Sequence, residues 1–494
     1  MKYLIVKIWG EELGRLVWDQ TRRITYFLFN PNLTVRPDIA PLLNPSATWN
    51  NDIPVFGDSK RLYQSLPTFL ADSLPDSWGN RLFDQWVRQN NISRSKITPL
   101  YKLMFIGKRG MGALEFEPAA EELAHPHQVN LDSLYRLAID ILSERETLSI
   151  DSADQLTLNT LLAVGTSAGG RQMKAIIAIS PATGEIRSGQ VDNLTGFDYF
   201  LIKFEDEMVP TSEVEISCYE LAVKSGIEME ECRLINVEGA NHFLTKRFDR
   251  KNGEKIHVST LAAINPDANS YEDLFDTARR LKLSENEISE LFRRMVFNIL
   301  INNTDDHNKN FSFLLEKGGE WRLAPAYDMT FIFNKYANGG EAERCLSVYG
   351  KVEDISKEDL LEFAKENNIP NPGKIIDCVA HALKTLPDVA EKYKIPNKWR
   401  AIFIMTVKRN LANFGYIESQ KERSFSDGDN NRFENISLSI NSKGYYQVSA
   451  EINGMPKRHF IKPGTNEYSK LQEYEIGKLN ENDFFIIIRN IFLP

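Results

Sequence analysis

Hydrophobic and polar positions alternate along the first thirty residues and predict strands. Runs rich in β-branched and aromatic residues at 2–9, 14–20 and 22–29 are separated by short polar turns. We therefore predict a β-rich amino-terminal module. Residues 74–91 and 131–144 instead repeat Leu, Ile, Phe and Trp every three or four positions, which predicts short helices on this module.

The middle of the chain returns to strand-like runs and then becomes helical. Residues 163–180, 197–205 and 241–250 contain predicted strands, with one helix near 215–225. After Arg250 helices dominate. The clearest begins at Ser284, where Ser284 and Glu287 form a predicted capping box and apolar positions follow a helical period to Leu300.

The character of the sequence changes again near residue 421. Residues 421–431 are polar and rich in turn formers, so we predict a linker there. Three strand-like runs follow at 436–440, 445–452 and 457–463. We expect them to form a small β-rich domain appended to the end of the chain.

Composition limits the possible environments. A chain of 494 residues with 42% hydrophobic residues can form two to four domains with a sizeable core. The net charge of -9 argues against a generally basic surface for nucleic acid, so DNA contact would need a local patch or a partner. The four cysteines form no CxxC pair, which argues against disulfide or zinc frameworks. With no signal-like or 18-residue apolar run, we expect a cytoplasmic protein.

The clearest chemistry lies between Asn302 and Asp328. Asp305 and Asn310 are five residues apart, the spacing of the base and one metal ligand in a kinase catalytic loop. Asp328 follows a predicted hairpin formed by residues 311–324. We predict that Asp305 accepts the proton of a substrate hydroxyl and that Asn310 and Asp328 bind Mg²⁺, which together indicate ATP-dependent phosphoryl transfer.

Neighbouring residues leave alternatives open. Asp306 could be the reactive carboxylate, although only Asp305 has the five-residue offset to Asn310. We expect His307 to be a structural hydrogen-bonding group, because kinases use a carboxylate as the base. Lys309 could pair with the γ-phosphate or remain solvated. The Asp and Asn spacing by itself also arises by chance in chains of this length.

Glycines and lysines upstream could contact phosphates. Residues 167–174 place small residues ahead of a strand, where backbone N–H groups could cover phosphates, although a glycine pair also occurs in ordinary turns. Lys203 lies in a buried-looking strand, where a kinase places its phosphate-binding lysine; the alternative is a lysine at a strand edge. For the three glycines at 107–112 we favour a plain hairpin turn over a phosphate contact.

Together these motifs resemble the HipA family of bacterial serine/threonine kinases, the toxins of HipBA-type toxin–antitoxin systems. The resemblance covers residues 1 to about 420, with the motifs in the family's order. It rests on SLPDSWGNRL (73–82), the 167–174 loop, Lys203, KRFDR (246–250), TDDHNKNFS (304–312) and PAYDM (325–329).

The resemblance implies an α+β, two-lobed, protein-kinase-like fold. It implies a β-rich amino-terminal subdomain over 1–120, a kinase N-lobe over 121–250, an all-helical C-lobe over 251–420, and the linker with its appended β-rich domain over 421–494. It assigns Asp305 as the base and Asn310 and Asp328 as Mg²⁺ ligands. The implied nucleotide contacts are Lys203, Lys174, Ser167, Gly169, Gly170, Phe248 and Lys309.

The resemblance also implies partners. Such toxins phosphorylate a serine or threonine of a translation component, such as glutamyl-tRNA synthetase, and autophosphorylate their glycine loop, where Ser167 is the matching position. A HipB-like helix-turn-helix antitoxin binds the kinase, so that DNA contact is indirect. This chain departs from the family at Lys246, where many members have glutamate, and beyond residue 420. Two other functions remain possible, a catalytically silent antitoxin-binding scaffold and a lipid kinase.

Overall fold

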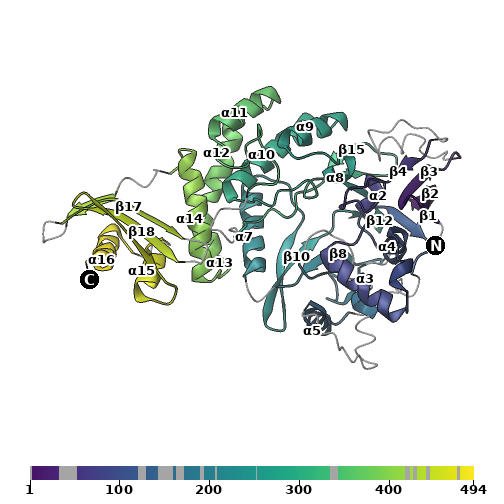
Figure 1. Ribbon diagram of the computed structural model, residues 1–494, viewed down its shortest axis with the longest axis horizontal. Coiled ribbons are helices and arrows are strands. Elements are labelled where there is room, and N and C mark those ends of the chain that lie inside the picture. Colours follow the sequence, from purple (N-terminus) through teal and green to yellow (C-terminus); the bar gives the residue numbers. More distant parts are fainter. Residues whose placement is uncertain are drawn as a thin grey trace. The chain divides into compact units, whose positions relative to one another are not determined.

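The computed structural model is a mixed α/β protein (Figure 1). Its chain divides into two compact units. Unit 1 contains residues 1–207, 229–288 and 307–327, and unit 2 contains residues 208–228, 289–306 and 328–494. The structure describes 3–32, 53–120, 129–142, 159–162, 172–189, 194–205, 209–251, 253–333, 343–417, 423–426, 431–440, 445–475 and 479–493.

The amino-terminal meander predicted from the sequence is confirmed in unit 1. It forms an antiparallel five-stranded sheet in the order β4-β3-β2-β1-β5. The strands are β1 (Tyr3–Ile8), β2 (Glu11–Asp19), β3 (Ile24–Phe29), β4 (Val55–Phe56) and β5 (Leu114–Glu117). Between β4 and β5 the chain forms the helices α2 (Thr68–Ala71), α3 (Ser77–Gln89) and α4 (Pro99–Ile106) and the 3₁₀ turn η1 (Arg94–Lys96).

A second antiparallel sheet of unit 1 has the order β7-β6-β8-β10-β9. Its strands are β6 (Lys174–Ile179), β7 (Ile186–Ser188), β8 (Asp198–Lys203), β9 (Cys232–Val237) and β10 (Ala240–Lys246), and α5 (Leu131–Leu142) packs on β9. Every residue of β6 is buried. One hydrophobic core runs from the first sheet into the second, so the two amino-terminal segments 1–120 and 121–250 fold together rather than around separate cores.

Strands continue beyond residue 250. Unit 1 also contains the hairpin β11 (Arg250–Lys251) and β12 (Glu254–Lys255) and the three-stranded sheet β13 (His257–Thr260), β14 (Ser312–Leu315) and β15 (Trp321–Leu323). The expected hairpin over 311–324 is present. β13 was not expected, because four residues are too few to show a period and β13 is placed by its pairing with β14. Unit 1 also contains helices α8 (Leu261–Ile264) and α9 (Tyr271–Arg280) and the first residues of α10 (Glu285–Ile301).

Unit 2 is built mainly of helices. Besides most of α10 it contains α7 (Thr211–Lys224), α11 (Lys357–Glu366), α12 (Pro372–Leu383), α13 (Leu386–Lys392) and α14 (Asn397–Asn413), and both α12 and α13 pack on α7. The predicted capping box of α10 is confirmed, since Ser284 N–H donates to Glu287 at 2.8 Å and Glu287 N–H donates back to Ser284 Oγ at 3.4 Å. Across the described ranges, no helix combines the length and the hydrophobicity needed to cross a membrane.

The end of the chain folds as a sheet covered by two helices (Figure 1). The antiparallel strands β16 (Arg423–Ser426), β17 (Arg432–Ile440), β18 (Tyr446–Ile452) and β19 (Met455–Ile461) bury one face against α15 (Asn466–Glu475) and α16 (Glu481–Phe492). Two features differ from expectation. Part of the predicted linker forms β16, where Phe425 stacks on Phe433, and the helices were not predicted, because the apolar run of α16 is also strand-like by propensity.

A buried charge cluster joins the glycine turn at 107–112 to the KRFDR motif within unit 1. Asp249 accepts two hydrogen bonds from Arg247, at 2.8 and 2.7 Å, one from Arg250 at 2.7 Å and one from Gly112 N–H at 2.8 Å. Burial by itself raises the pKa of Asp249, but the two guanidinium groups hold it well below its usual range. The turn joins α4 to β5, so the predicted hairpin was wrong at this position, and the Gly112 N–H is engaged by a carboxylate.

We expect Asp249→Asn to destabilise the protein by about 3–5 kcal/mol, because two buried guanidinium groups lose their counter-charge. Urea unfolding would measure this change. Glu316→Gln is the control, since it breaks the exposed ion pair with Lys251 and should change the free energy of unfolding little. Equal effects of the two substitutions would contradict the prediction.

A second stability prediction concerns His257 of β13. Its ring is buried, and neither nitrogen has a hydrogen-bond partner in the part of the chain that the structure describes. Burial lowers the pKa of His257 to about 3, whereas the unfolded chain keeps a value of about 6.5. Between these values the unfolded state binds more protons, so stability decreases as the pH falls below about 6.5.

At pH 5 this proton uptake should lower the free energy of unfolding by about 2 kcal/mol relative to pH 8. His257→Leu should flatten the dependence of the urea midpoint on pH over that interval. His381→Gln, at an exposed histidine, is the control and should retain the wild-type slope. A wild-type slope in His257→Leu would show that another group is responsible.

Candidate active site

Within unit 2, Asn303 joins the loop after α10 to the segment that begins at Asp328. Asn303 is buried, and its Nδ2 donates to Asn298 Oδ1 at 3.0 Å and to the Asp328 carbonyl at 3.1 Å. The Ile332 N–H donates to the Asn302 carbonyl at 3.2 Å. The predicted base segment and one predicted Mg²⁺ ligand are thus held side by side. Asn303 was not among the predicted site residues, although it lies only two positions before Asp305 in the sequence.

Asp328 has an uncommon backbone conformation. Its φ of +52° lies in the left-handed region, which aspartate tolerates better than most residues with a Cβ. Its side chain is half-buried. Residues held in such conformations concentrate at functional sites, so this geometry is consistent with a carboxylate placed for ligand binding.

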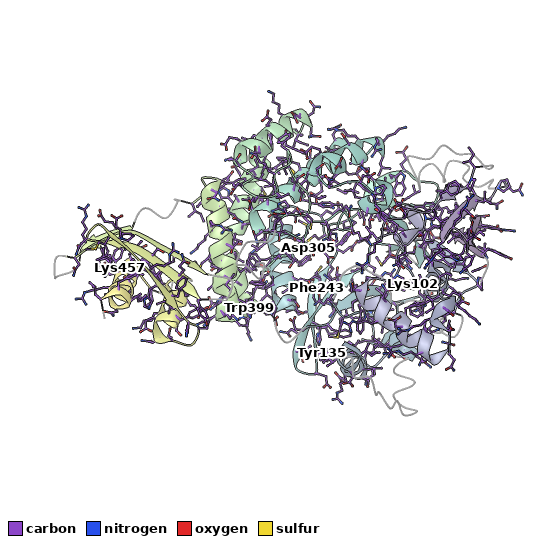
Figure 2. All side chains as sticks on the ribbon, in the orientation of Figure 1. Lys102, Tyr135, Phe243, Asp305, Trp399 and Lys457 are labelled. Carbon is purple, nitrogen blue, oxygen red and sulfur yellow. The ribbon has the colours of Figure 1, made fainter. Side chains whose placement is uncertain are left out.

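The neighbouring carboxylates Asp305 and Asp306 lie in opposite environments. Asp306 is fully buried and pairs with Arg344, whose Nη1 donates to Oδ2 at 2.7 Å. The N–H groups of Cys345 and Leu346 donate to Asp306 Oδ1 at 3.1 and 3.4 Å. Asp305 is exposed and is labelled in the loop after α10 (Figure 2). The buried ion pair occupies Asp306, which leaves Asp305 as the carboxylate at the surface.

A thiol lies next to the predicted base. Cys345 Sγ is 3.9 Å from Asp305 Oδ1. Burial, together with the negative charges of Asp305 and Asp306, raises the pKa of the Cys345 thiol to about 11. The thiol is therefore protonated at neutral pH and can donate weakly to Asp305. Cys345 was not predicted as a site residue, because it is 40 residues from Asp305 in the sequence and no local pattern links the two.

The second half of the predicted catalytic loop lies in unit 1. His307 Nδ1 accepts the Lys309 N–H at 3.2 Å, and the His307 carbonyl accepts the Asn310 N–H at 2.8 Å. The Tyr327 hydroxyl donates to the Lys309 carbonyl at 2.7 Å, and its ring centroid is 5.8 Å from that of Phe248. His307 thus makes the kind of structural hydrogen bond that we expected, and unit 1 contains Phe248, Lys309 and Asn310.

The two predicted phosphate-binding lysines are direct neighbours across β6 and β8. Lys174 is opposite Lys203 in the antiparallel register. Lys174 is only 2% exposed, and its Nζ is 2.9 Å from Asp76 Oδ2, so its charge is balanced inside the fold. Lys203 is half-buried, with Nζ 5.6 Å from the ring centroid of Phe243 on β10 (Figure 2). The same face of the sheet therefore holds one lysine in a buried ion pair and one lysine over an aromatic ring.

The SLPDSWGNRL motif contributes to this arrangement. Asp76 caps α3 by accepting the Gly79 N–H at 2.6 Å through Oδ1, while its Oδ2 lies next to Lys174. The indole N–H of Trp78 donates to the Lys174 carbonyl at 2.9 Å. The divergent Lys246 pairs with Asp198 of β8 at 2.9 Å. Ser167, Gly169 and Gly170 lie outside the described residues, so their predicted contacts to phosphate remain predictions.

The predicted Mg²⁺ ligands have suitable chemistry. Asp328 offers a carboxylate and Asn310 an amide oxygen, and Mg²⁺ prefers such hard oxygen ligands, completing its shell with water and phosphate oxygens. In the described ranges no group of three or more His, Cys, Asp and Glu residues could form a site made by the protein alone. A site shared with a nucleotide needs no such group.

The models of one protein family match most of this chain. Residues 4–117 match the model of the HipA N-terminal domain, and residues 166–389 match that of the HipA-like C-terminal domain. A "Putative kinase" of Haemophilus influenzae is 28% identical over 170 residues, covering 30% of this chain and 49% of that protein. A "Putative kinase" of Sinorhizobium fredii is 23% identical over 205 residues, covering 37% and 50%. The chain thus spans about half the length of these curated relatives.

A solved structure shares the fold. A chain of the Shewanella oneidensis MR-1 complex of the toxin–antitoxin proteins HipA and HipB with operator DNA superimposes with a TM-score of 0.55. The match has 15% sequence identity and covers 83% of this chain and 97% of that one. At this identity the match establishes the similarity of the fold.

Proposed function

The chain belongs to the HipA family, and from this premise we propose that it is an ATP- and Mg²⁺-dependent protein serine/threonine kinase that acts as the toxin of a toxin–antitoxin system. One observation carries the proposal. The loop after α10 exposes Asp305 while its neighbour Asp306 is buried in an ion pair. Asn303 holds the Asp328 backbone to the same loop.

The proposed roles follow the needs of phosphoryl transfer. Asp305 accepts the proton of the attacking hydroxyl, and Asn310 and Asp328 hold Mg²⁺. When bound, Mg²⁺ neutralises charge on the phosphate oxygens. Lys203 binds the nucleotide phosphates as a compact positive charge. The exposed position of Asp305 supports its role, since a base must reach a substrate that approaches from solvent.

Other residues would complete the nucleotide site. We assign phosphate contacts to the loop with Ser167, Gly169 and Gly170, and a further contact to Lys309. Phe248 would contact the nucleotide from the turn between β10 and β11, where its ring lies near Tyr327. The ammonium group of Lys174 is already paired, so Lys174 would act by anchoring the end of the glycine loop.

The proposed substrate is a serine or threonine of a translation component, such as glutamyl-tRNA synthetase, together with Ser167 of the chain itself. The proposed partner is a HipB-like helix-turn-helix antitoxin, through which any DNA contact would be made. The net charge of -9 supports such indirect contact, because an acidic protein gains little from direct binding to phosphates.

Incubation of the purified protein with Mg²⁺ and γ-labelled ATP, alone and with cell lysate, tests the proposal. We expect mass spectrometry to locate phosphate on Ser167 or on a lysate protein. Ser167→Ala should remove the autophosphorylation and retain the transfer of phosphate to the lysate protein. The absence of both transfer and an ATP-dependent thermal shift would favour a silent antitoxin-binding scaffold. Label that appears only in added lipid vesicles would identify a lipid kinase instead.

A further inference from the structure

The short helix α8 supports the catalytic loop within unit 1. The Leu261 N–H donates to the Phe311 carbonyl at 2.8 Å, and the Ala262 N–H donates to the Asn308 carbonyl at 3.1 Å. These two carbonyls flank Lys309 and Asn310 in the sequence. The first N–H groups of a helix lack partners inside the helix, and here loop carbonyls satisfy them. The position of the loop is therefore tied to the position of α8.

Helix α8 is itself held by the amino-terminal subdomain. Thr260 caps α8, its Oγ1 accepting the Ala263 N–H at 3.2 Å. The carboxylate of Asp72, at the end of α2, accepts both the N–H and the Oγ–H of Thr260 at 2.8 Å. The Thr68 hydroxyl donates to the Ala263 carbonyl at 2.7 Å. α2 and α8 accordingly lie next to each other (Figure 1).

Opposing electrostatic effects act on the buried carboxyl group of Asp72. Burial raises the pKa of Asp72, whereas the hydrogen bonds from Thr260 and the positive charge of Lys309 act to lower it. A desolvated carboxylate costs stability unless specific donors compensate it. The donors here belong to Thr260, the cap of α8, and Lys309 of the same loop adds a favourable positive charge, so Asp72 interacts with both α8 and the loop.

We propose that Asp72 is a positioning residue for the catalytic loop. Through Thr260 it fixes α8, and α8 fixes the loop segment that carries Asn310. The amino-terminal subdomain is then required to hold the Mg²⁺-binding side of the site in place, beyond its contribution to the common core. This inference rests on the proposed role of Asn310 as a Mg²⁺ ligand.

Asp72→Ala and Asp72→Asn in the full chain test this inference. Alanine removes the acceptor for Thr260, whereas asparagine keeps an amide oxygen that can accept the Thr260 N–H. Hydrogen exchange of peptides covering 307–312 should become about tenfold faster in Asp72→Ala and stay near the wild-type rate in Asp72→Asn. In kinase assays the Mg²⁺ concentration for half-maximal rate should rise about tenfold in Asp72→Ala only.

Thr25→Ala is the matched control, because it removes a buried hydrogen bond of the same subdomain, to the Ser65 carbonyl at 2.6 Å. It should lower the melting temperature without changing exchange at 307–312 or the Mg²⁺ dependence. Thr260→Val removes the hydroxyl that donates to Asp72 and should also speed hydrogen exchange at 307–312. This variant tests the inference if Asp72→Ala does not fold.

Unchanged exchange at 307–312 in both Asp72→Ala and Thr260→Val would overturn the inference. This readout does not depend on activity. If the wild-type protein transferred no phosphate, the proposed function would fail, while the exchange rates would still decide whether Asp72 positions the loop.

Discussion

Asp305→Asn is expected to lower the rate of phosphoryl transfer by about 10²- to 10⁴-fold without changing the melting temperature, because the amide cannot accept the proton of the attacking hydroxyl. Folding should be unaffected, since the side chain is exposed and exposed substitutions rarely change stability by more than about 0.5 kcal/mol. Initial rates with labelled ATP measure the loss of phosphoryl transfer, and thermal unfolding measures the melting temperature.

Asp354→Asn is the matched control, because it makes the same substitution at another exposed position of unit 2. It should leave both rate and melting temperature unchanged. If Asp305→Asn retained more than about a tenth of the wild-type rate, Asp305 would not be the general base.

The adjacent carboxylate should give the opposite result. Asp306→Asn is expected to lower the free energy of unfolding by about 3–5 kcal/mol, because Arg344 would remain buried without its counter-charge. Urea unfolding measures this loss. Activity should decrease only in proportion to the folded fraction, provided that Asp306 has no chemical role.

The double variant Asp306→Asn with Arg344→Met separates charge from packing. Removing both charges should recover much of the loss, because the largest penalty comes from one unpaired buried charge. If the double variant lost as much free energy of unfolding as the two single variants together, the ion pair would not be the source of the effect.

The sequence predicted the elements whose signals are local. The amino-terminal meander, the capped helix α10, the hairpin at 311–324 and the strands near the end of the chain all show alternating or helical periods, and the structure contains them. Elements without such a signal were missed. The strand β13 has only four residues, and α16 consists largely of residues that suit strands as well as helices.

Motif spacing likewise selected Asp305, Asn310 and Asp328 as candidate site residues, and the apolar strand around Lys203 selected that lysine. The five-residue offset to Asn310 favoured Asp305 over Asp306, but it could not show that Asp306 is buried in an ion pair, because its partner, Arg344, is 38 residues away in the sequence. Asn303 and Cys345 were missed for the same reason, since their contacts become visible only when the loop lies next to other segments of unit 2.

The sequence by itself therefore determined the family, the order of most elements and the candidate residues for phosphoryl transfer, because periodicity and motif spacing act over a few residues. Only the tertiary structure decided which ionisable groups are buried. Asp76 pairs with Lys174, and Asp249 pairs with Arg247 and Arg250 beside Gly112. Burial and charge pairing depend on segments far apart in the chain, and no local pattern records which segments meet.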